Sequence, residues 1–482
     1  MRRMRVALVL LSLVPSACQC GSDTETDAGG DAAAAHDASP VDTSGGGDSG
    51  LHDARVPDTA ASDHRTPDTG AGADAARADA GEPVLDCPAL PAATGTVVQI
   101  AAGDVSGLVD AVSSAATGTT LLLADGTYAL DGAQLNFRTD GVTLRSQSGN
   151  PEAVTLDGNY LSGELVSITA SDVTVAELTL REAYDHPIHV SGRADANITG
   201  VRIYRVRVID AGEQAIKINP SAQLFYADQG RIECSHIELT DDGRSQIRNN
   251  CYTGGIDAHA AWGWQVRRNT ILGFWCPAGL SEHGVHFWRS GRDTLVEANT
   301  IVNCARGIGF GLGDTGTGSD RVYTPDPYPG SGYLGHIDGV IRNNMISASG
   351  AIFSSGARFD CGICLEQARG VEVYHNSVAT TQNPASSSLE WRWPNTTVTV
   401  VNNLLSHNIN PRTTVPVTLD GNLESAALAL FADVPAGDLH LVPAQAAAAI
   451  DQGAALASGL CDEDIDGDAR SGARDIGADE IP

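Results

Sequence analysis

Residues 254–313 read GGIDAHAAWGWQVRRNTILGFWCPAGLSEHGVHFWRSGRDTLVEANTIVNCARGIGFGLG. Three short runs in this stretch alternate between apolar and other residues: I-D-A at 256–258, V-H-F at 285–287 and I-G-F at 308–310. Such alternation predicts β-strands with one buried face and one free face. Between the runs lie two copies of a longer unit, V-x-x-N-x-I, at 266–271 and 296–301. A unit that recurs in this way predicts a repeat architecture.

The repeat can be followed along the chain from an apolar anchor at the start of each coil. Successive anchors are about 27 to 32 residues apart, with one interval of about 45, as expected for a solenoid. The predicted anchors are Val175, Ile203, Cys234, Val266, Val296, Ile341, Val373 and Val400. Three residues after them come Leu178, Val206, Ile237, Asn269, Asn299, Asn344, Asn376 and Asn403. The five asparagines predict a ladder of stacked amides, which is a structural feature.

Each coil also carries a second apolar-alternating run. These runs lie at 188–190, 216–218, 256–258, 285–287, 308–310, 363–365, 389–391 and 417–419. The sequence has no heptads and no long helical stripes. It therefore predicts an all-β chain folded as a single-stranded parallel β-helix.

A short helix and an apolar strand precede the repeats. Apolar residues recur at helical spacing between Val105 and Val112, and Asp104 is a suitable N-cap. The segment L-L-L-A-D-G-T-Y follows at 121–128. A helix followed by this segment resembles the start of the pectate-lyase-like right-handed parallel β-helices, in which the helix covers the open end. The resemblance implies a right-handed coil with an N-terminal capping helix, which would shield unpaired strand edges.

The first 20 residues are typical of an export signal. Three arginines precede an apolar run at 6–14 that is too short to span a bilayer. The small residues before Cys18 resemble the bacterial lipobox, with Pro15 where leucine is usual. The resemblance implies that Cys18 is lipidated and that the protein is a lipoprotein of the outer membrane or cell surface. A cleaved secretory signal would instead give a secreted protein.

Residues 21–85 are rich in alanine, aspartate and glycine and nearly lack large apolar side chains. Such a segment buries too little apolar surface to offset its ordering entropy, so we predict a disordered linker. It carries roughly a third of the formal net charge of −30. Because no basic run is present, nucleic acid is not an expected partner. Because the net charge is negative, an acidic polymer would need a locally basic site on the protein in order to bind.

Ten cysteines are present, and eight remain apart from Cys18 and Cys20. In an exported chain these eight could form disulfides, and Cys87 with Cys461 could join the two ends of the folded domain. Cys361 and Cys364 are spaced for a local bridge or for two free thiols. No second pair at zinc-site spacing accompanies them, so we predict no metal there.

We place the β-helix at 86–445 and a C-terminal capping tail at 446–482. The tail resembles the C-terminal ends of many secreted bacterial β-helices. Asp462, Asp464 and Asp466 mimic the start of a calcium-binding EF-hand loop, but Ala473 stands at the position of its bidentate glutamate. The pattern therefore favours a cap over a calcium site.

Adjacent coils of a β-helix stack at about 4.8 Å, so equivalent residues form columns. In the second run of each coil, the middle residue and the residue after the run should face outward. The first outward column is then His189, Lys217, Asp257, His286 and Gly309. The second is Ser191, Asn219, His259, Trp288 and Gly311. Solvated sheet faces rarely group imidazoles in this way, so the columns are a candidate site, with these residues nearby: His186, Glu213, Glu282, His283, Arg289 and Arg306.

A long glycine-rich loop at 314–336 is expected to form a wall or lid of this site. Gly309 and Gly311 would leave a hollow beside it. Aromatic side chains could line a groove for sugar rings: Trp262, Trp264, Trp275 and Trp288. Trp264 and Trp275 could equally fill the core or a turn.

Two segments resemble a motif of the mannuronan C5-epimerases: G-I-D-A-H at 255–259 and, one coil later, E-H-G-V at 282–285. The resemblance implies functional roles for Asp257 and His259. Gly254 stands where that family has its catalytic tyrosine, and Ala258 replaces a proline. Tyr252, two residues before Gly254, can take the role of the tyrosine only if the backbone bulges.

In that family, and in β-helix polysaccharide lyases, the reaction removes the weakly acidic proton α to a uronate carboxylate. Such chemistry needs a base, a cation or calcium against the carboxylate, and an acid. By their positions in the columns, Lys217 or His259 could be the base, and Arg289 or Arg306 could neutralise the carboxylate. Asp257 would orient the imidazole or hold calcium.

We therefore predict a polysaccharide lyase or C5-epimerase that acts on a uronate-containing glycan as a monomer, with calcium as the one cofactor that the chemistry could require. The predicted catalytic residues are Lys217, Tyr252, Asp257, His259 and His286. The predicted substrate-binding residues are His189, Asn219, His283, Trp288, Arg289 and Arg306.

Three alternatives remain open at this point. A non-catalytic, surface-anchored β-helix could use the same columns to bind glycan, because the fold hosts both roles. Glycoside hydrolysis would need two carboxylates at a suitable separation, and only Asp257 and Glu282 are obvious candidates. A metal site could be formed from these histidines, although their spacing alone does not support it: His186, His189, His259 and His286.

Overall fold

The computed structural model describes residues 87–313, 321–354, 358–382 and 387–481. The chain divides into two units, Met1–Asp74 and Ala75–Pro482, and the described residues belong to the second. The predicted signal at 1–20 with Cys18 and the predicted linker at 21–85 lie outside the described residues. Among the helices of the described ranges, none is long and apolar enough to cross a membrane.

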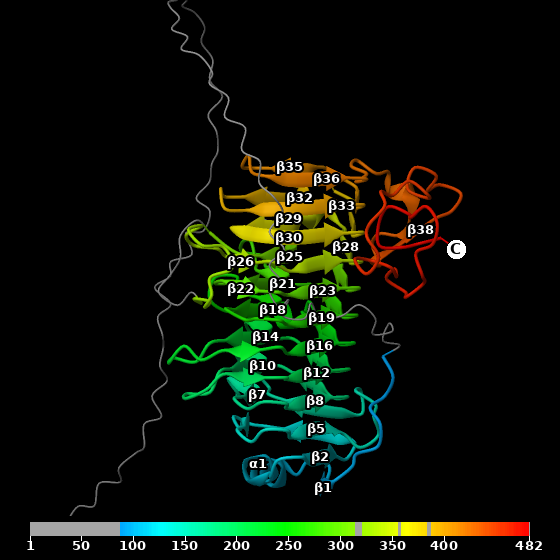
Figure 1. The fold of residues 1–482 in the computed structure, drawn as a ribbon. Coiled ribbons are helices and arrows are strands. Elements are labelled where there is room, and N and C mark those ends of the chain that lie inside the picture. The colour runs from blue at the N-terminus through cyan, green and yellow to red at the C-terminus, as the bar shows by residue number, and fades with distance from the viewer. Residues whose placement is uncertain (1–86, 314–320, 355–357, 383–386, 482) are drawn as a thin grey trace, which may run out of the picture. The chain divides into compact units, whose positions relative to one another are not determined.

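Three parallel sheets run along the described chain, and a typical coil contributes one strand to sheet A, then one to sheet B and one to sheet C (Figure 1). The strands of sheet A are β1 (Thr96–Ile100), β2 (Thr119–Leu123), β5 (Thr143–Ser146), β8 (Thr174–Ala176), β12 (Arg202–Tyr204), β16 (Arg231–Glu233), β19 (Gln265–Arg267), β22 (Gly291–Arg292), β23 (Leu295–Glu297), β26 (His336–Ile337), β27 (Val340–Arg342), β30 (Ala368–Tyr374), β33 (Thr397–Val401) and β36 (Val417–Asp420).

The strands of sheet B are β3 (Gly126–Ala129), β6 (Val154–Asp157), β9 (Thr179–Arg181), β13 (Arg207–Ile209), β17 (His236–Glu238), β20 (Thr270–Leu272), β24 (Thr300–Val302), β28 (Met345–Ala348), β31 (Ser377–Thr380) and β34 (Leu404–Leu405). The strands of sheet C are β4 (Leu135–Phe137), β7 (Glu164–Ile168), β10 (His186–Ser191), β14 (Gln214–Asn219), β18 (Gly254–His259), β21 (His283–Trp288), β25 (Arg306–Phe310), β29 (Cys361–Glu366), β32 (Ser387–Arg392) and β35 (Ile409–Pro411). Smaller elements are the pairs β11 (Ile198–Thr199) with β15 (Ala227–Asp228) and β37 (Phe431–Asp433) with β38 (Asp438–Leu441), and the 3-10 helices η1 (Gly243–Gln246), η2 (Ala351–Phe353) and η3 (Leu428–Leu430).

The predicted all-β, right-handed parallel β-helix is confirmed, with its core between the three sheets. Apolar residues pair in register from coil to coil, as Ile216 with Ile256 and Ile256 with Val285. Each of these side chains is fully buried. The V-x-x-N-x-I unit spans two strands, because its valine lies on sheet A and its isoleucine on sheet B.

The predicted capping helix is α1 (Val105–Ser114), at the N-terminal end of the stack (Figure 1). Asp104 caps it by accepting a hydrogen bond from the backbone of Gly107 at 2.9 Å. Leu108 and Val112 are buried in the core of the coils.

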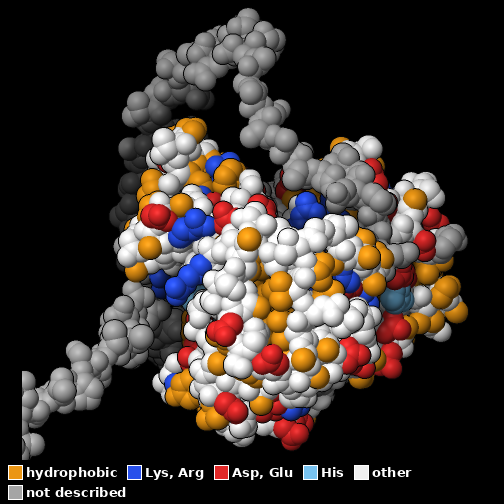
Figure 2. Space-filling model, turned by 90° about the horizontal axis from the view of Figure 1, so that it is seen from below, with side chains coloured by type: hydrophobic (Ala, Val, Ile, Leu, Met, Phe, Trp, Pro, Cys, Tyr) orange, Lys and Arg blue, Asp and Glu red, His pale blue; other side chains and the backbone are white. Residues whose placement is uncertain are grey.

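On the face that Figure 2 shows, hydrophobic and acidic side chains are mixed, and Lys and Arg form separate small groups.

One predicted anchor is wrong by two residues. Ile232 holds the inward position, in register with Ile203 and Val266, where the repeat count predicted Cys234. Cys234 instead follows the strand with a positive φ of 56° and bonds to Cys87. Cys234 stands at nearly the repeat interval, and cysteine is a frequent core residue, so the repeat pattern alone predicts it at the inward position.

The last predicted second run, at 417–419, is also wrong. It forms β36 of sheet A, where Val417 pairs with Val398 and Leu419 with Val400. The strand of sheet C in that coil is β35, whose Ile409 pairs with Leu389. The final coil is short, so the chain reaches sheet A again where the interval of the earlier coils predicted sheet C.

The asparagine ladder is confirmed and extends further than predicted. Asn344 donates its side-chain amide to the Oδ1 of Asn376 at 2.9 Å, and its own Oδ1 accepts from the backbone and side chain of Asn299 at 3.0 and 2.9 Å. Asn403 continues the ladder to Asn422 at 2.9 Å. The interior members are completely buried, so each amide replaces the hydrogen bonds that water would make.

Replacing Asn344 with alanine should lower the free energy of unfolding by about 3 kcal/mol or more, because each buried polar group left without a partner costs about 1–3 kcal/mol. The backbone N–H of Asn299 would lose its acceptor. Asn422→Ala is the matched control at the partly exposed end of the ladder, where water can replace the lost partner. Urea unfolding curves of the two variants measure the difference, and equal losses would contradict the argument.

The described part of the C-terminal segment packs against sheet B. Leu430, Leu439 and Ala478 share an apolar cluster with Met345 and Leu404, and Figure 1 shows β38 beside the coils. The segment therefore lies on the flank of the stack, and the predicted division at residue 446 stays a prediction.

The aspartate-rich turn of the tail is held by its own backbone. The Oδ1 of Asp464 accepts N–H groups of Asp466, Gly467 and Asp468, each at 2.9 Å. Its Oδ2 accepts from the backbone of Glu480 at 3.0 Å. This use of the carboxylate as a turn cap supports the structural role over a calcium loop.

The disulfides differ from the predicted link between the two ends of the domain. Among the described cysteines, Cys87 bonds to Cys234, Cys251 to Cys276 and Cys361 to Cys364, whereas Cys304 and Cys461 are buried free thiols. Cys87 meets the coil of β16, but Cys461 lies beside Asn343, several coils further along the stack. The two cysteines are therefore too far apart to bond. The local bridge at 361 and 364 is one of the two predicted alternatives.

Candidate active site on sheet C

The first predicted outward column is confirmed by strand register. His189 pairs with Lys217, Lys217 with Asp257, Asp257 with His286, and His286 with Gly309. In the second column, Ser191 pairs with Asn219 and His259 with Trp288. Because neighbouring strands are one coil apart, residues that are 23 to 40 positions apart in sequence become direct neighbours on sheet C.

Lys217 is the centre of a hydrogen-bonded group. Its Nζ forms an ion pair with Oδ2 of Asp257. The same Nζ lies 2.8 Å from the hydroxyl of Tyr252 and 3.2 Å from Nε2 of His259. Nε2 of His259 is also 3.1 Å from Oδ2 of Asp257. Four of the five predicted catalytic side chains thus meet around one ammonium group; the fifth, His286, has its Nδ1 3.6 Å from Oδ1 of Asp257.

This group is buried, so its protonation depends on the balance between burial and the neighbouring charges. Burial alone would lower the pKa of Lys217, but Asp257 and Tyr252 outweigh it and raise the pKa above its usual value. Burial would likewise raise the pKa of Asp257, but Lys217 and His259 hold it well below its usual value. Lys217 is therefore an ammonium and Asp257 a carboxylate at neutral pH, which argues against Lys217 as the base.

His259 and Tyr252 are the two neutral partners. Burial and the neighbouring Lys217 lower the pKa of His259 to about 4. Burial raises the pKa of Tyr252 to about 12, although Lys217 acts in the opposite direction. At neutral pH the imidazole can therefore accept a proton and the phenol can donate one.

Tyr252 reaches the group in spite of its offset from the family motif. It lies in the loop before β18, next to Cys251, which has a φ of 73° and is bonded to Cys276. The positive φ bends the backbone, and the disulfide ties the bend to the next coil. This is the bulge that the sequence comparison required.

Asp257 is held on both oxygens. Trp288 donates its Nε1 to Oδ1 at 2.8 Å, while Oδ2 faces Lys217 and His259. The imidazole of His259 contacts the Trp288 ring edge-on, with centroids 4.5 Å apart. Calcium takes six to eight oxygen ligands. The described residues around Asp257 offer mainly nitrogen donors, so they do not fit the calcium ion that the chemistry could have required.

Several predicted binding residues have other partners. His189 forms a hydrogen bond through Nδ1 with Glu164 of the preceding coil. Arg306 pairs with Asp360 at 3.0 Å. Arg289 lies over the ring of Trp288, with its guanidinium carbon 4.8 Å from the centroid.

Asn219 lies in the second column, two residues after Lys217 on β14, and Oδ1 of Asn219 is buried without a hydrogen bond among the described residues. The ring of His283 lies beside that of His286, with centroids 4.1 Å apart and planes tilted by 34°. Trp288, a predicted substrate-binding residue, donates a hydrogen bond to the central group.

The hollow predicted at Gly309 and Gly311 is not present. A Cβ on Gly309 would lie 2.4 Å from Nε2 of His283, so the imidazole occupies that space. A Cβ on Gly311 would lie 1.8 Å from the carbonyl oxygen of Glu366. These glycines permit close packing of side chain and backbone rather than a cavity.

Two of the four tryptophans predicted to line an aromatic groove pack against other side chains. Trp264 is fully buried in the core and Trp275 packs against Phe353, whereas Trp262 donates to Asp293 at 2.7 Å. Of the loop predicted to be a wall, 314–320 lie outside the described residues. In the described part, Tyr323 donates to the backbone of Ser290 at 2.9 Å.

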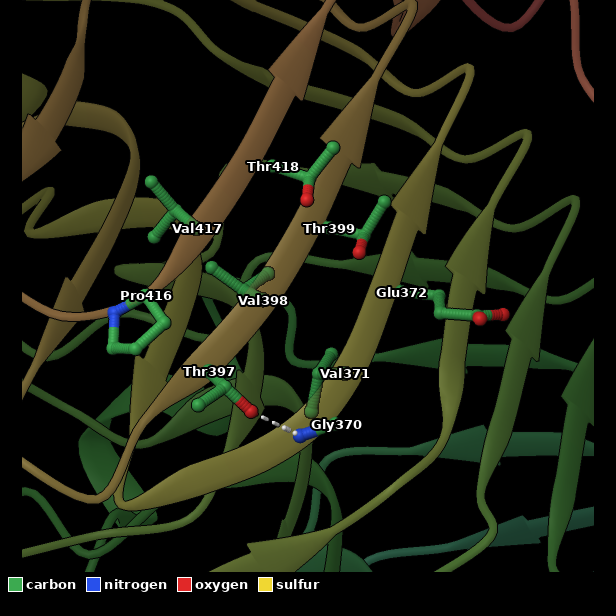
Figure 3. A pocket seen from close by; sticks show the side chains of 9 residues that line it. All are labelled: Gly370, Val371, Glu372, Thr397, Val398, Thr399, Pro416, Val417 and Thr418. Carbon is green, nitrogen blue, oxygen red and sulfur yellow. Dashed lines mark hydrogen bonds between the residues drawn. The ribbon is translucent and has the colours of Figure 1, made fainter. Parts of the chain in front are cut away.

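A surface hollow of about 360 Å³ lies elsewhere, over β30, β33 and β36 (Figure 3). Its lining consists of Gly370, Val371, Glu372, Thr397, Val398, Thr399, Pro416, Val417 and Thr418. Glu372 is the one charged residue among these nine, and Thr397 is occupied by a hydrogen bond from the backbone of Gly370 at 2.8 Å. It offers no convergent acid and base, so the candidate site remains on sheet C.

The structure places two acidic residues, Glu164 and Glu282, against histidines of the candidate site. Glu164 aligns with His186 at the start of β7 and holds His189. The alternating L-V-S-I run at 165–168 could have revealed this coil, but the repeat count began one coil later. Glu282, noted only as a neighbour, lies 3.5 Å from Nδ1 of His286.

Stability should fall as the pH is lowered, because buried histidines must take up protons on unfolding. The pKa of His186, His283 and His336 is lowered by burial from 6.5 to about 3, and that of His259 to about 4. Between pH 6.5 and about 4 the unfolded chain binds more protons than the folded one, so the free energy of unfolding decreases with decreasing pH, by several kcal/mol in total.

Urea unfolding at pH 7.5 and 4.5 measures this loss. His336→Gln, away from the Lys217 group, should reduce the pH dependence because one titrating imidazole is removed. A free energy of unfolding that stays constant over this range would contradict the neutral, buried state of these histidines.

No family model matches the chain, and no curated protein matches its sequence. Among solved structures, an alginate lyase from Paenibacillus sp. strain FPU-7 is similar with 14% identity and a TM-score of 0.47, over 67% of this chain and 97% of that one. Pectate lyase Pel9A is similar with 12% identity and a TM-score of 0.48, over 81% and 97% of the two chains. PfbA, a surface adhesin of Streptococcus pneumoniae, is similar with 11% identity and a TM-score of 0.36, over 66% and 84%. At such values no reaction is transferred from these proteins to this one.

Proposed function

We propose that this β-helix acts on a uronate-containing polysaccharide by abstracting the proton at C5, as a lyase or a C5-epimerase. The observation that carries the proposal is the group formed by Lys217, Tyr252, Asp257 and His259. It combines a neutral imidazole and a protonated phenol, each within hydrogen-bond distance of the same ammonium group. These are a base, an acid and a cation for one carboxylate.

Each residue has a distinct role in the proposal. His259 accepts the proton from C5, since its low pKa keeps it neutral at pH 7. Lys217 stays protonated and stabilises the negative charge that develops on the uronate carboxylate. Tyr252 donates a proton, to the leaving oxygen in a lyase or to the opposite face of C5 in an epimerase. Asp257 holds Lys217 and His259 in place through its Oδ2.

The test uses purified protein with alginate, pectate and glycosaminoglycans, with and without calcium. Ultraviolet absorbance reports unsaturated uronate ends and thus a lyase, whereas proton NMR reports epimerised residues. Activity on one of these polymers that is lost in His259→Gln would support the proposal. Absence of both signals on every polymer would overturn it.

A non-catalytic glycan-binding role is the second candidate. The observation in its favour is burial: Lys217 is 3% exposed, Asp257 2% and His259 6%. A polymer would have to reach groups that present little surface. Retention of the protein on an immobilised polysaccharide, together with no turnover of that polysaccharide, would favour this role.

We also propose that the chain is exported and anchored through a lipid on Cys18. The arginines, apolar run and small residues of the leader support this placement. Membrane fractions from cells that express the full chain or Cys18→Ala provide the test. The full chain should be recovered with membranes and the variant should not.

A further inference from the structure

Two histidines of β21 project from the same face although they are three residues apart. On a regularly alternating strand, His283 and His286 would point to opposite faces. Here two consecutive residues between them face the core. Val285 is fully buried, and a Cβ on Gly284 would lie 3.0 Å from the side chain of Ile301 in the core. Both imidazoles therefore emerge on the outer face, next to Glu282.

Three donor atoms converge there at ion-pair distances. Oε2 of Glu282 lies 3.7 Å from Nδ1 of His283 and 3.5 Å from Nδ1 of His286. One ligand atom from each of the three residues lies within 4.8 Å of the other two. These separations are long for hydrogen bonds. They are close to the edge of a tetrahedron with metal–ligand bonds of 2.0–2.1 Å, which is about 3.4 Å.

Both imidazoles leave a buried nitrogen unsatisfied. His283 is 2% exposed and His286 1%. Within the described ranges, Nδ1 of each ring has no hydrogen-bond partner. Leaving a buried polar atom unpaired is unfavourable. A cation between the rings and Glu282 would satisfy both nitrogens at once.

The hydrogen bonds of the outer ring atoms also suit a metal site. Nε2 of His286 lies 3.1 Å from the carbonyl oxygen of Gly311, so it carries the proton and donates it. This bond leaves the lone pair of Nδ1 directed toward Glu282. A histidine that binds a metal through one ring nitrogen commonly donates the N–H of the other nitrogen to a backbone carbonyl in this way. The ring of His283 lies over Gly309, where any side chain would collide with it.

We infer that Glu282, His283 and His286 bind one transition-metal ion of the Zn²⁺ class. Two imidazoles and one carboxylate suit zinc and related ions, whereas calcium requires an all-oxygen shell. Three protein ligands leave a fourth position open. Oδ1 of Asp257 lies 3.6 Å from Nδ1 of His286. The inference goes beyond the proposed function and does not depend on it.

The test measures metal binding directly, without polysaccharide. Full-length protein is stripped with a chelator, dialysed, and titrated with Zn²⁺ or Ca²⁺ by calorimetry at pH 7.5. We expect one Zn²⁺ per chain and no comparable binding of Ca²⁺. His283→Ala and His286→Ala should each weaken Zn²⁺ binding on the order of 100-fold or more. His236→Ala removes a histidine that pairs with Glu238 on sheet B and should leave Zn²⁺ binding unchanged.

Two further measurements keep the inference testable if a histidine variant fails to fold. Gly309→Ala retains all three ligands but displaces the His283 ring, so it should also weaken binding. Co²⁺ bound to the unaltered protein should give the intense visible absorption of a tetrahedral site. The inference is overturned if the unaltered protein binds no Zn²⁺, if Ca²⁺ binds equally well, or if Co²⁺ gives only octahedral absorption. It is also overturned if the folded variants at 283, 286 and 309 bind Zn²⁺ as the unaltered protein does.

Discussion

Lys217→Met should lower the free energy of unfolding by about 3–5 kcal/mol, because it leaves the carboxylate of Asp257 buried without its cation. Asp257 is 2% exposed, so water cannot replace the lost charge. Urea unfolding at pH 7.5 measures the loss.

Two variants make this prediction specific. In Lys217→Met/Asp257→Asn the buried charge is gone as well, so the loss should be clearly smaller than the sum of the two single losses. Arg181→Met breaks an ion pair with Asp157 at 2.6 Å whose arginine is 44% exposed, and it should cost no more than about 1 kcal/mol. If the losses at Lys217 and Asp257 were simply additive, the ion pair would not be the cause.

His259→Gln should reduce kcat/KM about 10²–10⁴-fold on the polysaccharide that the unaltered protein turns over, because this is the usual contribution of a general base. Glutamine can keep a hydrogen bond to Lys217 or Asp257 but cannot take up a proton at neutral pH. The unaltered protein should lose the proposed activity only as the pH falls toward 4, where His259 becomes protonated. Initial rates between pH 4 and 9, measured by absorbance or NMR, check both effects.

His189→Gln is the matched control, because His189 shares the column but hydrogen-bonds Glu164 instead of Lys217. It should change kcat/KM far less than His259→Gln does. Tyr252→Phe removes the hydroxyl 2.8 Å from Nζ of Lys217 and should slow the reaction by a comparable factor to His259→Gln. Full activity in His259→Gln would contradict the role of His259 as the base.

The strand register predicted from the repeat interval is correct for most coils but wrong at two places. The columns of sheet C were correct because period-two alternation and the coil interval together place each outward residue. The count failed at Cys234, where an apolar residue stood near the expected interval, and at 417–419, where the last coil is short. Both errors arise because an interval with a tolerance of a few residues cannot specify register by itself.

The sequence by itself determined the parallel β-helix, the asparagine ladder and the face on which Lys217, Asp257 and His259 meet, since these depend on local alternation repeated at a nearly constant interval. Only the tertiary structure decided how the side chains on that face combine. The disulfide pairing, the position of Tyr252 and the convergence of Glu282 with His283 and His286 depend on backbone turns and on glycines such as Gly284 and Gly309. Protonation was decided there as well, because burial and neighbouring charges, rather than residue type, make Lys217 a cation and His259 a neutral imidazole.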